Sequence, residues 1–128
     1  MSEKPSVEQI LRKMEQQLGA EPLPMKLLAQ LSPETVYDHV AMRQHVDTRP
    51  SIPAKGKMLM FVATAAALGS EFCTRTYARL ALKAGASAEE ITEALVVARF
   101  VKASTVWATA VPAMELLVAA KKEAASAE

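Results

Sequence analysis

Ser70, Cys73 and Tyr77 are the residues whose types and spacing could carry out chemistry in this chain. They stand at positions i, i+3 and i+7, so a helix that begins at Ser70 presents all three on one face. With Ser70 as the N-cap, Cys73 occupies the third helical position, where the backbone amides and the helix macrodipole favour the thiolate. The nearby Arg75 adds a positive charge. Because the thiolate is the nucleophilic form of cysteine, the pattern predicts an activated thiol.

A structural interpretation of the same residues stays open. In that interpretation Cys73 is a small buried side chain, Ser70 is only a helix cap, and Tyr77 is a core aromatic with a hydrogen-bonded hydroxyl. The chain has one cysteine, which excludes an intrachain disulfide, CxxC redox pairs and CxxC zinc sites within one chain. A single free cysteine also fits a reducing, cytoplasmic location.

The two histidines form no metal-binding pattern. His39 and His45 are six residues apart, which does not place them on one helical face, and neither belongs to an HExxH motif. We therefore expect no metal and no cofactor. His39 and Arg43 are four residues apart and could together line a pocket, with a solvated helix face as the alternative.

Length and charge limit the functions that the chain can have. The 128 residues carry 15 basic and 14 acidic side chains, a net charge of +1, and 51% of them are apolar. One compact domain over residues 1–128 is expected, and the balanced charge predicts no nucleic-acid partner. The longest apolar run, 58–68, is shorter than the roughly 20 residues of a membrane span, and the start of the sequence lacks an apolar signal segment. We expect a soluble cytoplasmic protein with no membrane partner.

Helical periodicity along almost the whole sequence predicts an all-α fold that positions the candidate site. Ser6 and Gln9 form a capping box that starts the first helix, and Gly19 ends it. A second capping box begins at Ser87 and includes Glu90. The segment 47–53, with two prolines, is the clearest irregular connector.

The later helices are expected to form the core. The run 58–68 is apolar on all sides, which predicts a central helix surrounded by others. A helix over 71–84 follows it. The next helix is expected to turn four residues inward, namely Ile91, Leu95, Ala98 and Val101.

The last helix and one basic row leave alternatives open. Ser104 or Thr105 is expected to cap the last helix, and Pro112 either kinks that helix or marks its true start. The basic row of the site helix has i, i+4, i+8 spacing and indicates either a solvated face or an attraction for an anionic substrate. Its members are Arg75, Arg79 and Lys83.

The sequence resembles the superfamily of carboxymuconolactone decarboxylase and alkyl hydroperoxidase D, best over residues 53–118. The resemblance covers the apolar helix with the turn at Cys73, the "ALKAGAS" hairpin at 81–87, and a Trp107–Pro112 segment. It implies an orthogonal helical bundle of about six helices with a central apolar helix hairpin. It also implies a homo-oligomer, a trimer or hexamer, and the shortage of aromatics in an apolar chain favours buried subunit contacts.

The two branches of the superfamily imply different chemistry. In the hydroperoxidase branch the peroxide-attacking cysteine corresponds to Cys73, whereas its resolving cysteine, histidine and relay glutamate correspond to Ser70, Tyr77 and Met58. In the decarboxylase branch Glu71 matches the first glutamate, while Cys73 and Tyr77 replace the second glutamate and the histidine.

Three functional hypotheses follow. The first is a thiol-dependent hydroperoxidase of the peroxiredoxin type that uses Cys73, with Tyr77, Ser70 and Glu71 beside it, a small-molecule substrate and an external thiol as reductant. The second is a decarboxylase-like enzyme that processes a lactone or an acid. The third is an oligomeric binding protein that keeps the fold and has lost the catalytic relay.

Overall fold

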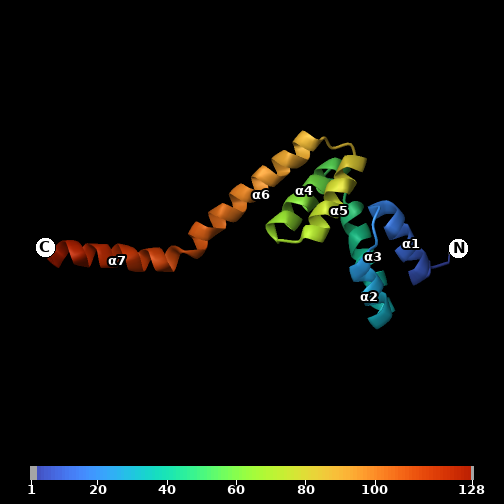
Figure 1. Cartoon of the computed structure of the whole chain (residues 1–128), viewed down its shortest axis with the longest axis horizontal. Coiled ribbons are helices and arrows are strands. Elements are labelled where there is room, and N and C mark those ends of the chain that lie inside the picture. The colour runs from blue at the N-terminus through green and yellow to red at the C-terminus, as the bar shows by residue number, and fades with distance from the viewer. Residues whose placement is uncertain (1–2, 128) are drawn as a thin grey trace.

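The computed structural model describes residues 3–127, which form seven α-helices and no strand. This confirms the all-α class. Figure 1 shows that the first five helices and the beginning of the sixth gather into a bundle, from which the rest of the chain runs away as a long arm. The helices are α1 (Val7–Leu18), α2 (Leu23–Leu31), α3 (Pro33–Asp47), α4 (Ala54–Ala67), α5 (Glu71–Lys83), α6 (Ala88–Thr109) and α7 (Val111–Ala127). We call residues 3–98 the bundle and residues 99–127 the arm.

Local capping signals set the ends of the helices as expected. The Ser6 side chain accepts a hydrogen bond from the Gln9 amide, and the Gln9 side chain accepts one from the Ser6 amide, at 3.2 and 2.8 Å. The capping box of Ser87 and Glu90 starts α6 in the same way. At Gly19 the backbone is left-handed, with φ of 66°, and a side chain there would also collide with Arg79.

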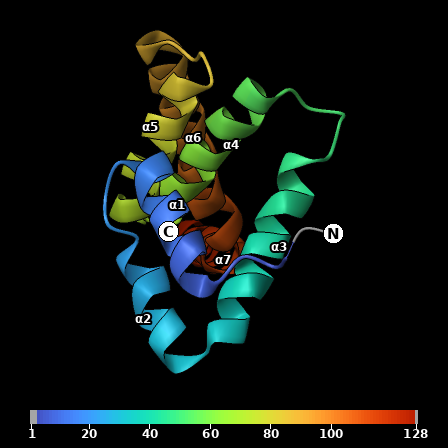
Figure 2. The same ribbon diagram turned by 90° about the vertical axis from the view of Figure 1, so that its right-hand side faces the viewer.

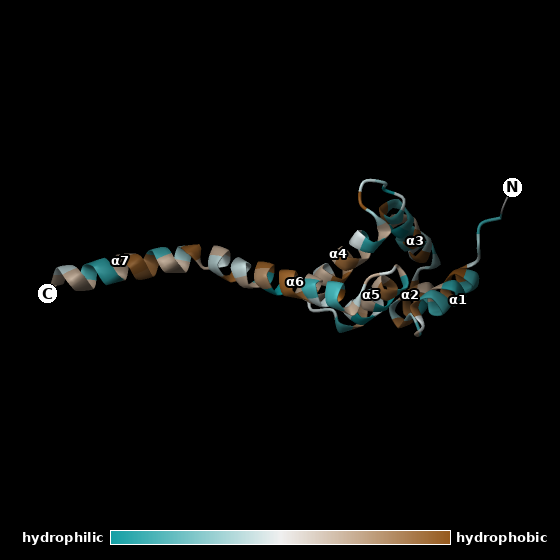
Figure 3. Cartoon of the chain, turned by 90° about the horizontal axis from the view of Figure 1, so that it is seen from above, coloured by the Kyte–Doolittle hydropathy of each residue, from teal (hydrophilic) through white to brown (hydrophobic). Residues whose placement is uncertain are grey.

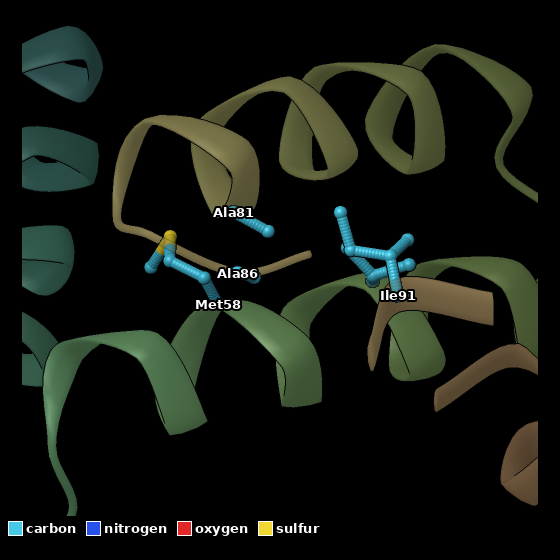
Figure 4. Packing of buried hydrophobic residues seen from close by; sticks show 5 residues of the cluster. Met58, Ala81, Ala86 and Ile91 are labelled. Carbon is cyan, nitrogen blue, oxygen red and sulfur yellow. The ribbon is translucent and has the colours of Figure 1, made fainter. Parts of the chain in front are cut away.

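The core of the bundle lies between α4, α5 and the start of α6. Met58 and Val62 from α4 face Ala81 from α5, and Ala86 and Ile91 close the cluster (Figure 4). Small alanines on α5 let the two helices approach closely, which is how the central apolar hairpin packs. The prediction that this apolar helix is surrounded by others therefore holds for the face of α4 that carries Met58 and Val62, whereas Met60 on another face is exposed.

The basic row of α5 serves to hold α1. The Arg79 guanidinium donates to the Leu18 carbonyl at 2.7 Å, and the Lys83 ammonium donates to the Gln17 carbonyl at 2.7 Å. Both acceptors lie in the last turn of α1, where carbonyls lack helical partners and the macrodipole is negative. For Arg79, which is half-buried, the expectation of a solvated face is wrong, because this side chain meets the end of α1, which sequence periodicity does not place beside α5. Arg75 and Lys83 are both exposed.

A buried lysine holds α3 to α4 by the same principle. Lys57 is buried, and its ammonium donates to backbone carbonyls that end α3 and begin the connector after it. The acceptors are the carbonyls of Val46 at 2.7 Å, Asp47 at 3.3 Å, and Arg49. A buried cation needs such partners. The contact therefore holds the C-terminal end of α3 against the first turn of α4.

The arm differs from the expected packing of the last helices. Ile91 and Ala98 are buried as predicted, but Leu95 is partly exposed and Val101 is 54% exposed, because α6 extends beyond the bundle after Ala98. No residue between 99 and 127 is buried. The inward stripe therefore ends at Ala98.

The boundary between the last two helices also lies later than predicted. Ser104 and Thr105 do not cap a helix, since α6 continues to Thr109 and their hydroxyls donate to carbonyls of the preceding turn. Pro112 is the second residue of α7 and so marks its start. No single helix of the described chain is long and apolar enough to cross a membrane; α6 and α7 meet the criteria only together, across a 52° bend.

Candidate functional site

An open cleft of about 880 Å³ lies between α1, α3 and α5 and contains the candidate nucleophile. Figure 2 shows α1 between the other two helices at this end of the molecule. Cys73 and Tyr77 line the cleft from α5, and His39 and Arg43 line it from α3. The structure thus brings the predicted thiol and phenol together, and it places His39 and Arg43 in a pocket, as one of the two alternatives proposed.

The cleft has a mostly apolar wall. It is formed by side chains from α1, α2, α3 and α5, with an amphipathic α1 turned toward α5. The apolar members are Ile10, Met14, Leu18, Met25, Val40, Phe72 and Leu80. Such a wall suits a small molecule with an apolar body, since burial of apolar surface supplies most of the binding free energy in pockets of this kind.

Cys73 has the local geometry that its spacing from Ser70 predicts. Ser70 is the N-cap of α5, and its hydroxyl oxygen accepts a hydrogen bond from the Cys73 amide at 3.2 Å. Cys73 is a free cysteine, neither buried nor fully exposed. Its thiol therefore lies in the first turn of a helix and at the wall of an open cleft, which are the two conditions for attack on a bound molecule.

Tyr77 is held by an aromatic contact from α4. Its ring packs edge-on against Phe61 with the ring centroids 5.0 Å apart, and the Arg43 guanidinium lies 4.9 Å from the Phe61 centroid. Arg43 is also fixed by Asp47, whose two carboxylate oxygens both lie 3.0 Å from Nε. Phe61 of α4 thus contacts both a cation on α3 and a phenol on α5.

The electrostatics of the cleft keep Tyr77 protonated. Burial raises the pKa of the Tyr77 phenol, the neighbouring Cys73 acts in the same direction, and Arg43 opposes both. At neutral pH the phenol is therefore a hydrogen-bond donor. It cannot serve as a general base there, because the phenolate is too scarce.

The other two predicted site residues lie outside the cleft. Ser70 caps the helix and does not line the cleft, and Glu71 is exposed in the first turn of α5. A carboxylate at that position interacts favourably with the helix dipole. The structure therefore gives both residues contacts that stabilise the helix start, and their part in chemistry stays a prediction.

Thr76 is a lining residue that the sequence reasoning missed. It is buried, lies three residues after Cys73 and faces the same cleft. Its spacing from Cys73 was the available signal, since i and i+3 share a helical face. Within residues 3–127, no three His, Cys, Asp or Glu side chains gather as they would to hold a metal ion.

The sequence was compared with those of known protein families. The sequence model of the carboxymuconolactone decarboxylase family matches residues 33–116. The chain belongs to the carboxymuconolactone decarboxylase family. The match begins at α3 and includes α4, α5 and α6, so it contains two of the three walls of the cleft. No curated protein matches the chain closely enough to be named as a relative.

Met58 stands where the resemblance places a catalytic residue. The resemblance places the relay glutamate of the hydroperoxidase branch at this position, and in this member of the carboxymuconolactone decarboxylase family the residue is a buried methionine packed in the core cluster. It does not line the cleft. Any acid or base that assists Cys73 must therefore come from another position.

Proposed function

We propose that the chain is a single-cysteine, thiol-dependent hydroperoxide reductase with Cys73 as its nucleophile. The observation that carries the proposal is the position of Cys73, whose partly exposed thiol lies in the first turn of α5 and lines a cleft with Tyr77. The apolar wall favours an organic hydroperoxide with an apolar body as the small-molecule substrate. A free thiol of this kind is suited to a reducing compartment, and we propose a cytoplasmic location.

The reaction would proceed by attack of the Cys73 thiolate on a peroxide oxygen. The S–O bond forms as the O–O bond breaks, Cys73 is oxidised to a sulfenic acid, and the alkoxide leaves as an alcohol after it takes a proton. Tyr77 is the protonated group that shares the cleft wall with Cys73, so its hydroxyl is the proposed hydrogen-bond donor to the leaving oxygen. The phenol regains its proton from solvent.

An external thiol would return Cys73 to its reduced state. The chain has no second cysteine, so no resolving thiol exists within one copy. The first external thiol would form a mixed disulfide with Cys73 and release water, and a second would release the Cys73 thiol together with an external disulfide. The openness of the cleft allows a small thiol to reach the sulfenic acid.

The structure gives the decarboxylase alternative less support. That chemistry would need Glu71, the only glutamate that the resemblance retains, close to the bound acid, yet Glu71 is exposed outside the cleft. The third alternative, a binding protein with an inert thiol, differs from our proposal in one measurable property, namely the reactivity of Cys73.

Trapping of the sulfenic acid tests the proposal. Purified protein treated with one equivalent of cumene hydroperoxide and then a sulfenic-acid-selective reagent should be labelled at Cys73 by mass spectrometry, and Cys73→Ser should not. Tyr77→Phe retains the ring that packs on Phe61 and should slow the labelling by about tenfold or more, because it removes the proton donor. Unmodified protein that labels no more than Cys73→Ser would exclude the proposal and favour an inert thiol.

A further inference from the structure

Arg43 is held in a fixed position in the wall of the cleft. Both carboxylate oxygens of Asp47 lie 3.0 Å from its Nε, and its guanidinium lies 4.9 Å from the centroid of the Phe61 ring. The backbone of Asp47 is itself held, because the buried Lys57 donates to its carbonyl at 3.3 Å. Two helices, α3 and α4, therefore position one guanidinium before any ligand arrives, which lowers the entropic cost of binding to it.

The terminal amino groups of Arg43 are available to a ligand. Both contacts with Asp47 use Nε, and within residues 3–127 neither Nη1 nor Nη2 donates a hydrogen bond to a protein acceptor. The side chain lines the cleft and is 35% exposed, so these donors can reach a bound molecule. The planar fork of a guanidinium matches the two oxygens of a carboxylate, which makes Arg43 a candidate anchor for an acid.

Arg43 also lies close to the reacting side chains. Burial raises the pKa of the Tyr77 phenol, Cys73 raises it further and Arg43 lowers it, so both groups lie within electrostatic reach of Tyr77. The aromatic contacts agree, since Phe61 packs against Tyr77 and also contacts Arg43. A molecule anchored on Arg43 can therefore place its other end beside Cys73 and Tyr77.

The charge that lines the cleft is positive overall. Three permanent cations line it, Lys13, Arg43 and Lys83, with one acid, Asp47. Asp47 offsets Arg43, whereas neither lysine forms a salt bridge within the described chain. Figure 3 shows hydrophilic and hydrophobic residues together on α1, so this helix contributes to both the charged and the apolar lining. Such a cleft favours a molecule with an apolar body and an anionic end.

We propose that the substrate of the cleft is an organic hydroperoxide that carries a carboxylate, and that Arg43 binds this carboxylate. The inference rests on the proposed hydroperoxide reductase function and specifies its substrate class. The apolar body would cover the wall that includes Met14 and Leu80, and the peroxide would lie beside Cys73. The carboxylate takes no part in bond making, so the S–O bond still forms as the O–O bond breaks and an alcohol leaves.

A matched pair of hydroperoxides tests the substrate class. The para-carboxylate and the para-carboxamide of cumene hydroperoxide have nearly the same shape and differ in charge. At low ionic strength the rate constant for oxidation of Cys73 should be at least about tenfold larger for the carboxylate, and added salt should reduce this ratio. Oxidation by both compounds at equal rates would overturn the inference while the proposed function stands.

A matched pair of variants locates the anchor. Arg43→Met keeps an unbranched side chain beside Phe61 and removes the guanidinium, so the ratio of the two rate constants should fall toward one. Arg12→Met removes the same charge from an exposed position of α1 that does not line the cleft, and should leave the ratio unchanged. Equal falls in both variants would show that net charge, and not Arg43, selects the substrate. Circular dichroism checks that each variant folds, and the ratio in the unmodified chain decides if Arg43→Met does not.

Calorimetry separates a failure of this inference from a failure of the proposed function. Binding of para-isopropylbenzoate, which carries no peroxide, does not depend on the reactivity of Cys73. Unmodified protein and Cys73→Ser should bind it at least about tenfold more tightly than para-isopropylbenzamide, and Arg43→Met should remove the difference. Binding of this kind without any oxidation of Cys73 would refute the proposed function and retain the carboxylate site. A benzoate that binds no better than the benzamide would refute the site.

Discussion

Two apolar helices of this chain, α4 and the arm part of α6, read alike in sequence and differ in what covers them. Val62 of α4 is completely buried by α5 and the start of α6, whereas Val106 of the arm is 59% exposed. Figure 1 shows the cause, because α5 folds back on α4 while α7 continues away from the bundle. The comparison teaches that apolar periodicity requires a covering surface and does not specify whether the same chain supplies it.

The first prediction tests this difference with the same substitution in both regions. Val62→Ala should lower the free energy of unfolding by about 2 kcal/mol at any protein concentration, because it removes buried methyl groups and leaves a cavity. If a second copy covers the arm, as the family resemblance implies, Val106→Ala should also lower the free energy of unfolding at concentrations where copies associate, and urea denaturation at two protein concentrations measures both. The loss at position 106 should shrink on dilution.

The sign of the effect at position 106 decides between a covered and a solvated arm. On a solvated helix, replacement of valine by alanine raises helix propensity and stabilises by a few tenths of a kcal/mol. A gain in stability for Val106→Ala at high concentration would therefore contradict a covered arm.

The second prediction compares the lysines that hold helix ends in the two regions. Lys57 is buried and donates to the carbonyls that end α3, whereas Lys102 is exposed and donates to the Ala67 carbonyl at 2.8 Å, where α6 leaves the bundle. Lys57→Met should cost about 2 kcal/mol, because the carbonyls at the end of α3 lose a charged donor that is itself buried. Lys102→Met should cost under about 1 kcal/mol. Thermal unfolding of the two variants gives the comparison, and equal costs would show that burial does not strengthen the contact.

The sequence predicts the parts of this fold that depend on neighbouring residues. The capping boxes at Ser6 and Ser87, the left-handed glycine at Gly19 and the start of α5 at Ser70 all follow from contacts within four residues. Contacts between distant segments were not predicted in the same way. Arg79 binds the end of α1, 61 residues away, and no local pattern specifies that partner.

In the candidate site, too, contacts within one helix could be predicted from the sequence and contacts between helices could not. Cys73 and Tyr77 share a face because they are on one helix, and that juxtaposition was predicted from their spacing. The Phe61 contact with Tyr77 and the position of Arg43 join three helices and needed the tertiary structure. Glu71 is grouped with the site because the resemblance matches it to the first glutamate of the decarboxylase branch, but its position on α5 does not line the cleft that Cys73 and Tyr77 share.

The reactivity of Cys73 in the folded and unfolded chain tests the central claim most directly. The rate constant for its reaction with cumene hydroperoxide is measured at one pH in native protein and in urea-unfolded protein, so that the same thiol serves as its own control. The account predicts that the native thiol reacts at least about tenfold faster, because the cleft holds the peroxide beside the thiol and positions Tyr77 as a proton donor. A native rate equal to or below that of the unfolded chain would contradict the account.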